Sequence, residues 1–337
     1  MELYLLHHER FNERFNCSIM TEDEWWSKGK PNAALGMMTI LVGLGFTIPY
    51  IPCLIVIARS NLLKFSAYKL MFYVGLSDVA CLLINSLVNG IQTIVGAVPC
   101  SYLEYTYIIG AVGVGTWASQ SVSVVLLAFN RCVELWQLPY IARAFEGRRT
   151  YFWIMGTLVY CSLFIWFSPG MVFSTIGYVW YFDPYYGLLD EGAYDPKKYV
   201  NWRFNVHNMS IIALLPTLYI ALIVTIYLKG GRSSAGNKIQ RLMTIQAFIL
   251  CLFTLLTACA YLHMQFFPVP VGVTITINVM WQFSNGAPAI MYLIMNKTIR
   301  QGVLRLFFCT NRVEHAHSIP SRSGNTFNPT SGTHAFL

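Results

Sequence analysis

Asp78 has the most unusual chemical setting in this sequence, because it is the one acidic side chain inside an apolar stretch of membrane-spanning length. A carboxylate in the hydrocarbon core costs at least about 2.5 kcal/mol unless it is solvated, paired or protonated, which makes such a residue a functional candidate. Asn85, one heptad further along, and Asn285 are its expected partners in a polar cluster. A neutral Asp78 in a purely structural hydrogen-bond network is the alternative.

The second chemical group is Asn130-Arg131-Cys132, which follows the third apolar stretch. Glu134 lies three residues beyond Arg131 and therefore on the same helical face. A single arginine at this boundary usually extends its charge to the lipid headgroups. Taken alone, Arg131 therefore indicates only the edge of the membrane.

Catalytic and metal-binding patterns are missing from the sequence. It contains no His-Glu-x-x-His, no Gly-rich phosphate loop with a lysine, and no Ser and His pair in matching apolar stretches. The adjacent His7 and His8 lie in a polar segment and do not form a metal site. We therefore expect a protein that is not an enzyme and that holds no cofactor and no metal.

The elements that must position Asp78 and Arg131 are seven apolar segments of about 20 residues or more. The chain is 55% hydrophobic and only 11% charged, and only helices or closed barrels satisfy backbone hydrogen bonds in lipid. Period-two alternation is missing, so we predict an all-α membrane protein with a seven-transmembrane helix bundle. The predicted spans are 35–58, 70–96, 103–129, 150–174, 206–228, 242–266 and 272–295. Pro169 and Pro216 are expected either to kink the fourth and fifth spans functionally or to serve packing.

The loops alternate in charge, and this pattern sets the orientation. The segment before the first span and the loops on its side hold seven of the 23 basic and eleven of the 15 acidic residues, whereas the opposite side holds 16 basic and three acidic residues. Short basic loops stay cytoplasmic, which predicts the N-terminus outside and the C-terminus inside. The net charge of +8 then reflects topology and anionic lipid headgroups, not nucleic-acid binding.

Four segments follow from this organisation. We predict an extracellular segment over 1–34 without a cleavable signal peptide, the bundle over 35–295, a short amphipathic helix on the membrane surface over 296–309, and a disordered cytoplasmic tail over 310–337. Only Cys17 and Cys100 lie clearly outside, where they could form a disulfide; a free Cys17 is the alternative. Asn16 begins an Asn-x-Ser glycosylation sequon on the same side.

The combination of seven helices, Asp78 in the second and Arg131 after the third resembles the G-protein-coupled receptor superfamily. The strings 50–54 (YIPCL), 130–136 (NRCVELW) and 296–300 (NKTIR) are similar to those of the nematode serpentine chemoreceptors of class T, over about residues 10–309. The resemblance implies a receptor in the plasma membrane of ciliated sensory neurons that binds an external small molecule and activates a heterotrimeric G protein. The second outer loop lacks the cysteine that in rhodopsin-like receptors usually pairs with the one before helix 3, which makes Cys17 the candidate partner for Cys100.

Residue roles are carried over from this resemblance. Those expected to switch the receptor between states are Asp78, Asn85, Asn130, Arg131, Asn285, Pro288 and Tyr292. Those expected to contact the G protein are Arg131, Arg143, Arg148, Lys229, Arg232, Lys238 and Arg241. Asn130 replaces the acid usual at this position and cannot form a charge-assisted pair with Arg131, which predicts a weaker resting lock.

The ligand site is expected between the outer halves of helices 3, 5, 6 and 7, the usual place for a cavity in a bundle. The candidate contacts are Trp117, His263, Gln265, Asn278, Trp281 and Gln282. Each has a plainer alternative, because the tryptophans could be packing residues and His263 an interfacial one.

Two alternative functions stay open. A membrane transporter or channel for a small solute is disfavoured because the halves of the chain show no internal repeat and only one acid is buried. The other is an accessory subunit that forms a receptor dimer with a true receptor, since Gly110, Gly113 and Gly115 in the third span would allow another helix to approach closely. Such glycines serve packing within one bundle equally well.

Overall fold

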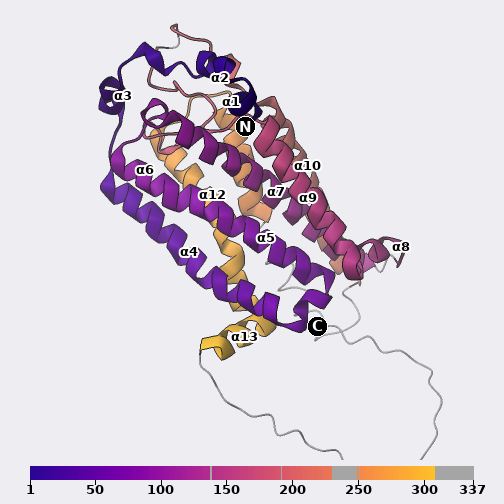
Figure 1. Cartoon of the computed structure of the whole chain (residues 1–337). Coiled ribbons are helices and arrows are strands. Elements are labelled where there is room, and N and C mark those ends of the chain that lie inside the picture. Colours follow the sequence, from indigo (N-terminus) through magenta and orange to yellow (C-terminus); the bar gives the residue numbers. More distant parts are fainter. Residues whose placement is uncertain (137–138, 191, 230–248, 250, 308–337) are drawn as a thin grey trace, which may run out of the picture.

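The computed structural model describes residues 1–136, 139–190, 192–229, 249 and 251–307. Within these residues the chain forms an elongated bundle of long helices (Figure 1). Five of the described helices are long and apolar enough to cross a membrane. They are α4 Ala33–Arg59 and the spans Ser66–Val95, Leu103–Glu134, Gly147–Phe167 and Trp202–Thr225.

The sixth and seventh helices complete the bundle. The described part of the sixth is the apolar helix Cys251–Met264, and the seventh is α12 Val271–Met295. α12 is long enough to span a bilayer, and the polar residues that lower its hydropathy, among them Asn278, Gln282 and Asn285, are buried inside the bundle. The predicted fold class, a seven-helix membrane bundle, is confirmed.

The second span is not one regular helix. α5 Ser66–Leu82 passes into the π-helical segment η3 Leu83–Val88 and then into α6 Asn89–Val95. A π turn leaves backbone carbonyls free for other donors, and Gln282 Nε2 donates to one of them, the carbonyl of Asn85, at 3.0 Å. The π segment thereby ties the second helix to the seventh.

The fourth helix is shorter than the predicted 150–174. α9 Thr150–Phe167 ends because Ser168 adopts an extended conformation before Pro169, as a residue preceding proline prefers. Pro169 therefore ends this helix and does not kink it. The chain continues into the antiparallel hairpin of β1 Val172–Ser174 and β2 Val179–Tyr181, with Phe173 opposite Trp180.

The third helix, α7 Leu103–Trp136, is longer than the predicted 103–129 and takes the central place in the bundle. It packs against α5, α9 and α10 Trp202–Lys229. Gly110 and Gly115 permit the approach on the α9 side, since a Cβ at Gly110 would lie 1.8 Å from the Met171 carbonyl oxygen and one at Gly115 would lie 2.3 Å from Ile165. These glycines serve packing within the bundle.

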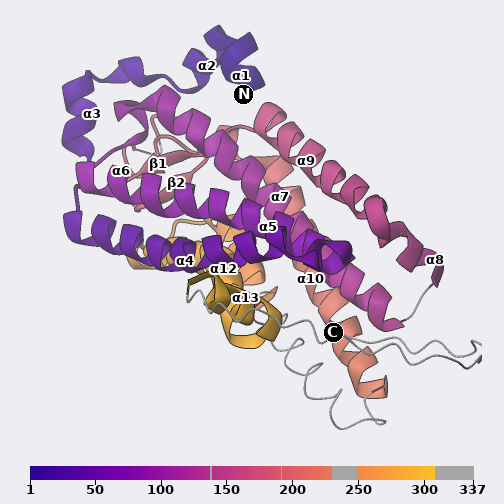
Figure 2. The same cartoon turned by 60° about the horizontal axis from the view of Figure 1, so that its bottom comes forward.

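The two ends of the bundle differ in what covers them. At one end lie α1 Glu2–Leu6, α2 His8–Arg14, η1 Cys17–Ile19 and α3 Glu22–Lys28, together with the hairpin (Figure 2). At the other end α13 Lys297–Phe307 packs against α4. We call these the hairpin end and the α13 end. The short connecting elements are η2 Asn61–Lys64, η4 Pro99–Ser101, α8 Pro139–Ala142, η5 Arg143–Phe145, η6 Gly147–Arg149 and η7 Pro196–Tyr199.

Candidate functional site

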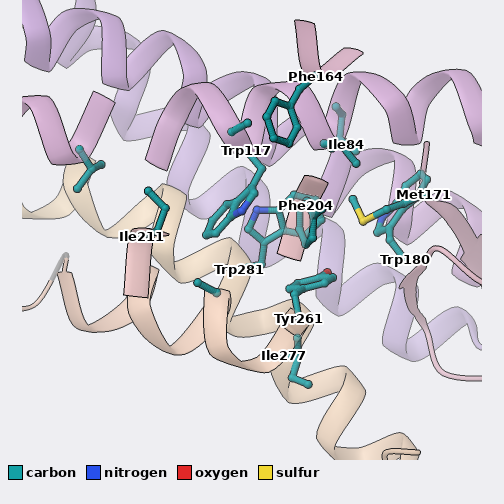
Figure 3. Close-up of a cluster of buried hydrophobic side chains, with 14 of the residues drawn as sticks. Ile84, Trp117, Phe164, Met171, Trp180, Phe204, Ile211, Tyr261, Ile277 and Trp281 are labelled. Atoms are coloured by element: carbon teal, nitrogen blue, oxygen red, sulfur yellow. The ribbon is translucent and has the colours of Figure 1, made fainter. Parts of the chain in front are cut away.

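A cluster of buried aromatic side chains lies below the hairpin, where α7, α10, α12 and the Cys251–Met264 helix meet (Figure 3). We call Trp117, Phe204, Tyr261, Trp281 and Trp180 the aromatic cluster. The rings of Trp117 and Trp281 meet edge to face with centroids 6.4 Å apart, and those of Tyr261 and Trp281 do so at 5.6 Å. Such edge-to-face contacts fix ring orientation beyond what area burial alone achieves.

Trp117 and Trp281 are the two predicted ligand contacts that the structure brings together. Asn278 and Gln282 lie on α12 but face the first two helices. Asn89 Nδ2 donates to Asn278 Oδ1 at 2.9 Å, and Gln282 Nε2 donates to the Thr39 carbonyl at 3.3 Å as well as to Asn85. These two amides are therefore occupied in holding helices 1, 2 and 7 together.

Gln265 and His263, which are also predicted ligand contacts, do not lie in the aromatic cluster. His263 faces outward and stacks on Phe267, because Tyr261 and Met264 take the buried face of this helix. Gln265 comes after the helix ends at Met264 and joins it to the start of α10. Its side chain accepts from the Asn201 N–H at 2.9 Å and donates to Asn205 Oδ1.

Sequence reasoning missed several residues of this region. Trp117 Nε1 donates to Asn208 Oδ1 on α10 at 3.1 Å. One position earlier, the buried His207 lies 2.9 Å from Ser121 Oγ through Nε2 and 3.0 Å from the Tyr160 hydroxyl through Nδ1. His207 and Asn208 fall at the predicted start of the fifth span, where polar residues are ordinary. Tyr261 gave no signal, because one tyrosine in an apolar helix has no distinguishing pattern.

Asp78 is completely buried, and its hydrogen-bond partner is Tyr50 on α4, whose hydroxyl donates to Oδ2 at 2.5 Å. Gln120 on α7 also faces this carboxyl group. The expected partners Asn85 and Asn285 do not bond to it, so that part of the prediction is wrong. Seven residues of helix rise about 10 Å along the axis, so Asn85 shares a face with Asp78 but is out of reach.

Asn285 instead bonds within its own helix, donating through Nδ2 to the Trp281 carbonyl at 2.7 Å. Several polar atoms around Asp78 are buried without a hydrogen-bond partner among the described residues. They are Asp78 Oδ1, both side-chain polar atoms of Asn85 and of Gln120, Gln282 Oε1 and Asn285 Oδ1. Buried polar groups in this state favour any rearrangement that gives them partners.

Pro288 and Tyr292 lie on the buried face of α12, one helical turn apart. The Tyr292 ring packs against Tyr50 with centroids 6.2 Å apart. Tyr50 therefore connects the carboxyl group of Asp78 to the part of α12 that leads to the α13 end. A shift of α12 would disturb the Tyr50–Asp78 hydrogen bond directly.

Asn130 and Arg131 lie near the α13 end of α7, and their partners come from α5 and from α7 itself. Arg131 Nη1 donates to Glu134 Oε2 at 3.2 Å, and Asn130 Nδ2 donates to Ser66 Oγ at 3.2 Å. Ser66 Oγ in turn donates to Glu134 Oε1 at 3.2 Å. Glu134, one turn further along α7, thus provides the carboxylate that Asn130 lacks. The expected contact of Arg131 with the inner part of helix 6 lies outside the described residues.

The basic residues expected to contact a G protein are only partly described. Arg143 and Arg148 are exposed between α8 and α9, and Lys229 is the last residue of α10. Arg232, Lys238 and Arg241 lie outside the described residues. The described part of this set gathers on the connection at the α13 end.

The hairpin end is fastened by covalent and polar contacts. Cys17 and Cys100 form a disulfide with Cα atoms 5.5 Å apart. The Tyr185 hydroxyl donates to the Asn16 carbonyl at 3.0 Å, and the Tyr199 hydroxyl donates to the Arg14 carbonyl at 2.8 Å. The sequon residue Asn16 is exposed, so a glycan there would extend into solvent.

Asp183 is an acidic residue of this end whose pKa is perturbed. Its carboxylate accepts from the Tyr185 N–H and from the Tyr194 hydroxyl, each at 2.9 Å. Burial raises the pKa of Asp183 to about 6, although both hydrogen bonds act in the opposite direction. The carboxyl group therefore changes charge within a mildly acidic range.

Comparison with known proteins gives three agreeing results. Residues 1–316 match the family described as serpentine type 7TM GPCR chemoreceptor Srt. The chain is 24% identical over 333 residues to the serpentine receptor class T-55 of Caenorhabditis elegans, covering 96% of this chain and 89% of that protein. The crystal structure of squid rhodopsin has a similar fold, with a TM-score of 0.57, 12% identity, and coverage of 86% of this chain and 87% of that one.

Proposed function

This chain belongs to the Srt family of serpentine seven-transmembrane chemoreceptors, and from that membership we propose that it binds an external small molecule and activates a heterotrimeric G protein. The family is one of receptors, not of enzymes. The observation that carries the proposal is the convergence of helices α7, α10, α12 and Cys251–Met264 on one buried aromatic cluster below the hairpin. A ligand there would touch four helices, of which α12 also contacts Tyr50 on α4.

The ligand site of this proposal is the aromatic cluster, with Trp117 and Trp281 as direct contacts. Trp281 is coupled to the polar region below it, since its carbonyl accepts from Asn285 Nδ2 and its ring contacts Trp117. A ligand that moves Trp281 would therefore move α12 relative to α7. Asn278 and Gln282 support the site by holding α12 against the first two helices.

The signalling surface of this proposal is the α13 end, where Arg131, Arg143 and Arg148 would meet the G protein. The link between the two sites is the buried set Asp78, Tyr50 and Tyr292, which joins α5, α4 and α12. Rearrangement of helices that pack with two discrete geometries is a known way to carry such coupling. Asn85, Asn285 and Pro288 belong to the same buried region.

The orientation in this proposal places the hairpin end outside the cell and the α13 end in the cytoplasm. The charge distribution supports it, since the basic excess lies on the loops of the α13 end. A disulfide at the hairpin end also agrees with an oxidising compartment. We propose the plasma membrane of sensory cilia as its location.

The test is G-protein activation in cells that express the chain, measured against a panel of volatile and water-soluble compounds. Arg131→Ala and Asp78→Asn are compared with Arg10→Ala, which removes an exposed positive charge at the hairpin end. Surface abundance is quantified for each variant. The proposal predicts a response that Arg131→Ala and Asp78→Asn abolish and Arg10→Ala retains.

The proposed function would be overturned by a solute flux or a current in the same cells without any G-protein response, which would favour a carrier or a channel. A G-protein response that survives Arg131→Ala at equal surface abundance would leave the receptor function intact and overturn the role of Arg131 as the signalling contact.

A further inference from the structure

The aromatic cluster and the adjoining Asn208 contain hydrogen-bond donors that have no acceptor among the described residues. Trp281 Nε1, Tyr261 Oη, Asn208 Nδ2 and Trp180 Nε1 are all buried and unpaired within that part of the chain. The first three belong to one contiguous set of contacts. Asn208 accepts from Trp117, Trp117 contacts Trp281, and Trp281 contacts Tyr261.

The chemistry of these groups is biased toward donation. An indole N–H only donates, and the Asn208 amide has already used its oxygen to accept from Trp117. A buried donor without an acceptor has lost its hydrogen bond to water without replacing it, which is unfavourable. Three such donors in one cluster therefore favour a guest that brings acceptor atoms.

The cluster offers no charge to a guest. Its members are aromatic, and the surrounding core is hydrophobic. His207, on the same helix as Phe204, lies against Ser121 and Tyr160, and the Asp78 carboxyl group accepts from Tyr50 through Oδ2. A charged guest would lose its hydration here without meeting a counterion, at a cost of several kcal/mol.

We propose that the aromatic cluster binds small, uncharged, largely apolar molecules that carry a hydrogen-bond acceptor, such as ketones, esters and ethers. The acceptor atom meets the Tyr261 hydroxyl and the Trp281 N–H, and the hydrocarbon part packs against Trp117 and Phe204. This assignment rests on the proposed receptor function for the location of the site and adds the chemical class of the ligand.

The close packing of the cluster adds a limit on size. The cavity of about 260 Å³ at the surface is lined by Arg10, Tyr107, Trp166 and Arg203 among others, and not by the aromatic cluster. The Trp281 and Tyr261 rings are in edge-to-face contact with centroids 5.6 Å apart, so a guest whose acceptor atom meets both groups must separate them. Small molecules require the least separation, and Trp281 must move when they bind.

The experiment measures binding to the purified full chain in nanodiscs by ligand-dependent thermal stabilisation. The probes share one carbon skeleton and are heptan-2-one, heptane, heptanoate and heptylammonium. Tyr261→Phe removes only the hydroxyl group of the cluster. The matched control is Tyr227→Phe on α10, because the Tyr227 side chain is 85% exposed and lies away from the cluster.

We expect heptan-2-one to have the highest affinity of the four probes. It should bind about tenfold or more tightly than heptane and than either ion. Tyr261→Phe should remove most of the advantage of the ketone over the alkane, and Tyr227→Phe should leave it unchanged. Equal binding of ketone and alkane, tighter binding of either ion, or no binding of any probe would overturn the assignment.

The outcomes for ligand class and for receptor function are separable. A G-protein response to a charged compound, without ketone binding, would end the ligand assignment and leave the receptor function intact. Ketone-selective binding that Tyr261→Phe weakens would support the ligand assignment even if no G protein responded. In that case the proposed receptor function would be contradicted and the ligand assignment would not.

Discussion

The hairpin end and the α13 end are built differently. The hairpin end joins distant segments by the Cys17–Cys100 disulfide and by hydrogen bonds such as Tyr185 to Asn16. The α13 end has exposed basic loops, and its described contacts around Arg131 are single polar bonds to Glu134 and between Asn130 and Ser66. The difference indicates that one end preserves a fixed shape, while the other is held by contacts that are weak enough to exchange.

The largest expected effect comes from removing the covalent link at the hairpin end. The Cys17–Cys100 disulfide has a sequence separation of 83 residues, and closing a loop of this length is worth roughly 4 to 5 kcal/mol. Cys17→Ser with Cys100→Ser should raise hydrogen-exchange rates in the loop after β2 by up to about a thousandfold. Exchange measured by mass spectrometry tests this.

The matched control for the disulfide is Cys259→Ser, which removes an exposed free cysteine. It should leave exchange in the loop unchanged. If the double serine variant exchanged like the control, the hairpin end would owe its fixed shape to packing alone, and the contrast between the two ends would lose its main support.

A smaller effect is expected from the pH dependence of Asp183. Because its pKa is about 6 in the folded protein, above its ordinary value of 3.8, folding favours the protonated form. The resulting stabilisation is fully present below about pH 4 and is lost as the pH rises through about 6. This stabilisation amounts to about 3 kcal/mol, because the pKa of Asp183 is raised by roughly two units.

Asp183→Asn keeps an acceptor oxygen and the shape of the side chain but cannot ionise. It should therefore make the hairpin end more stable at pH 7 and remove this pH dependence. Thermal unfolding between pH 4 and pH 8 measures the pH dependence of stability, with Asp190→Asn, a change at an exposed residue, as the control. A wild-type hairpin end that became more stable as the pH rose from 4 to 6 would contradict the assignment.

At the α13 end, the Arg131–Glu134 pair contributes less to the free energy of unfolding than the disulfide or Asp183 does. Its loss should nevertheless change G-protein signalling more. The Arg131–Glu134 pair is partly exposed, with side chains 32% and 44% accessible, so it contributes about 0.2 to 1 kcal/mol. Glu134→Gln should free Arg131 and raise basal G-protein activation up to about fivefold. Glu146→Gln, an exposed acid at the same end, serves as the control.

Asn130→Asp tests the restraint on Arg131 by adding a carboxylate, whereas Glu134→Gln removes one. A carboxylate beside Arg131 adds a second charge-assisted partner and should lower basal activation, by less than Glu134→Gln raises it. Unchanged basal activity in both variants at equal surface abundance would mean that Arg131 is not restrained by these side chains.

The smallest effect on stability is expected at Asn16, whose side chain is exposed. Asn16→Gln should remove a mobility shift sensitive to an N-glycosidase and leave ligand responses unchanged. The shift itself tests the orientation, because glycans are added only on the outer side. A chain that is inserted but never glycosylated at Asn16 would remove one support for the outside location of this end.

The sequence predicted the bundle well because hydrophobic length and charge alternation are local properties. It failed where tertiary contacts decide the outcome. Pro169 could kink or end a helix, and only the conformation of Ser168 shows that it ends α9. The π segment Leu83–Val88 has no sequence signature, yet it brings the Asn85 carbonyl to Gln282.

The site residues likewise divide into features that the sequence predicts locally and contacts that only tertiary packing decides. Asp78 stood out as the one acid within a span, but its partner Tyr50 comes from another helix and no spacing rule identifies it. Trp117 and Trp281 meet because α7 and α12 pack together, whereas His263 faces outward by the rotation of its helix. Residue type and position along a span did not distinguish these cases.

The most direct test of the two-end account measures ligand binding and nucleotide exchange on purified G protein with the same nanodisc samples. We expect Trp281→Ala to lose binding and exchange together. Arg131→Ala should bind ligand with unchanged affinity in the absence of G protein and should fail to stimulate exchange. If Arg131→Ala lost ligand affinity as Trp281→Ala does, or stimulated exchange normally, the division of binding and signalling between the two ends would be wrong.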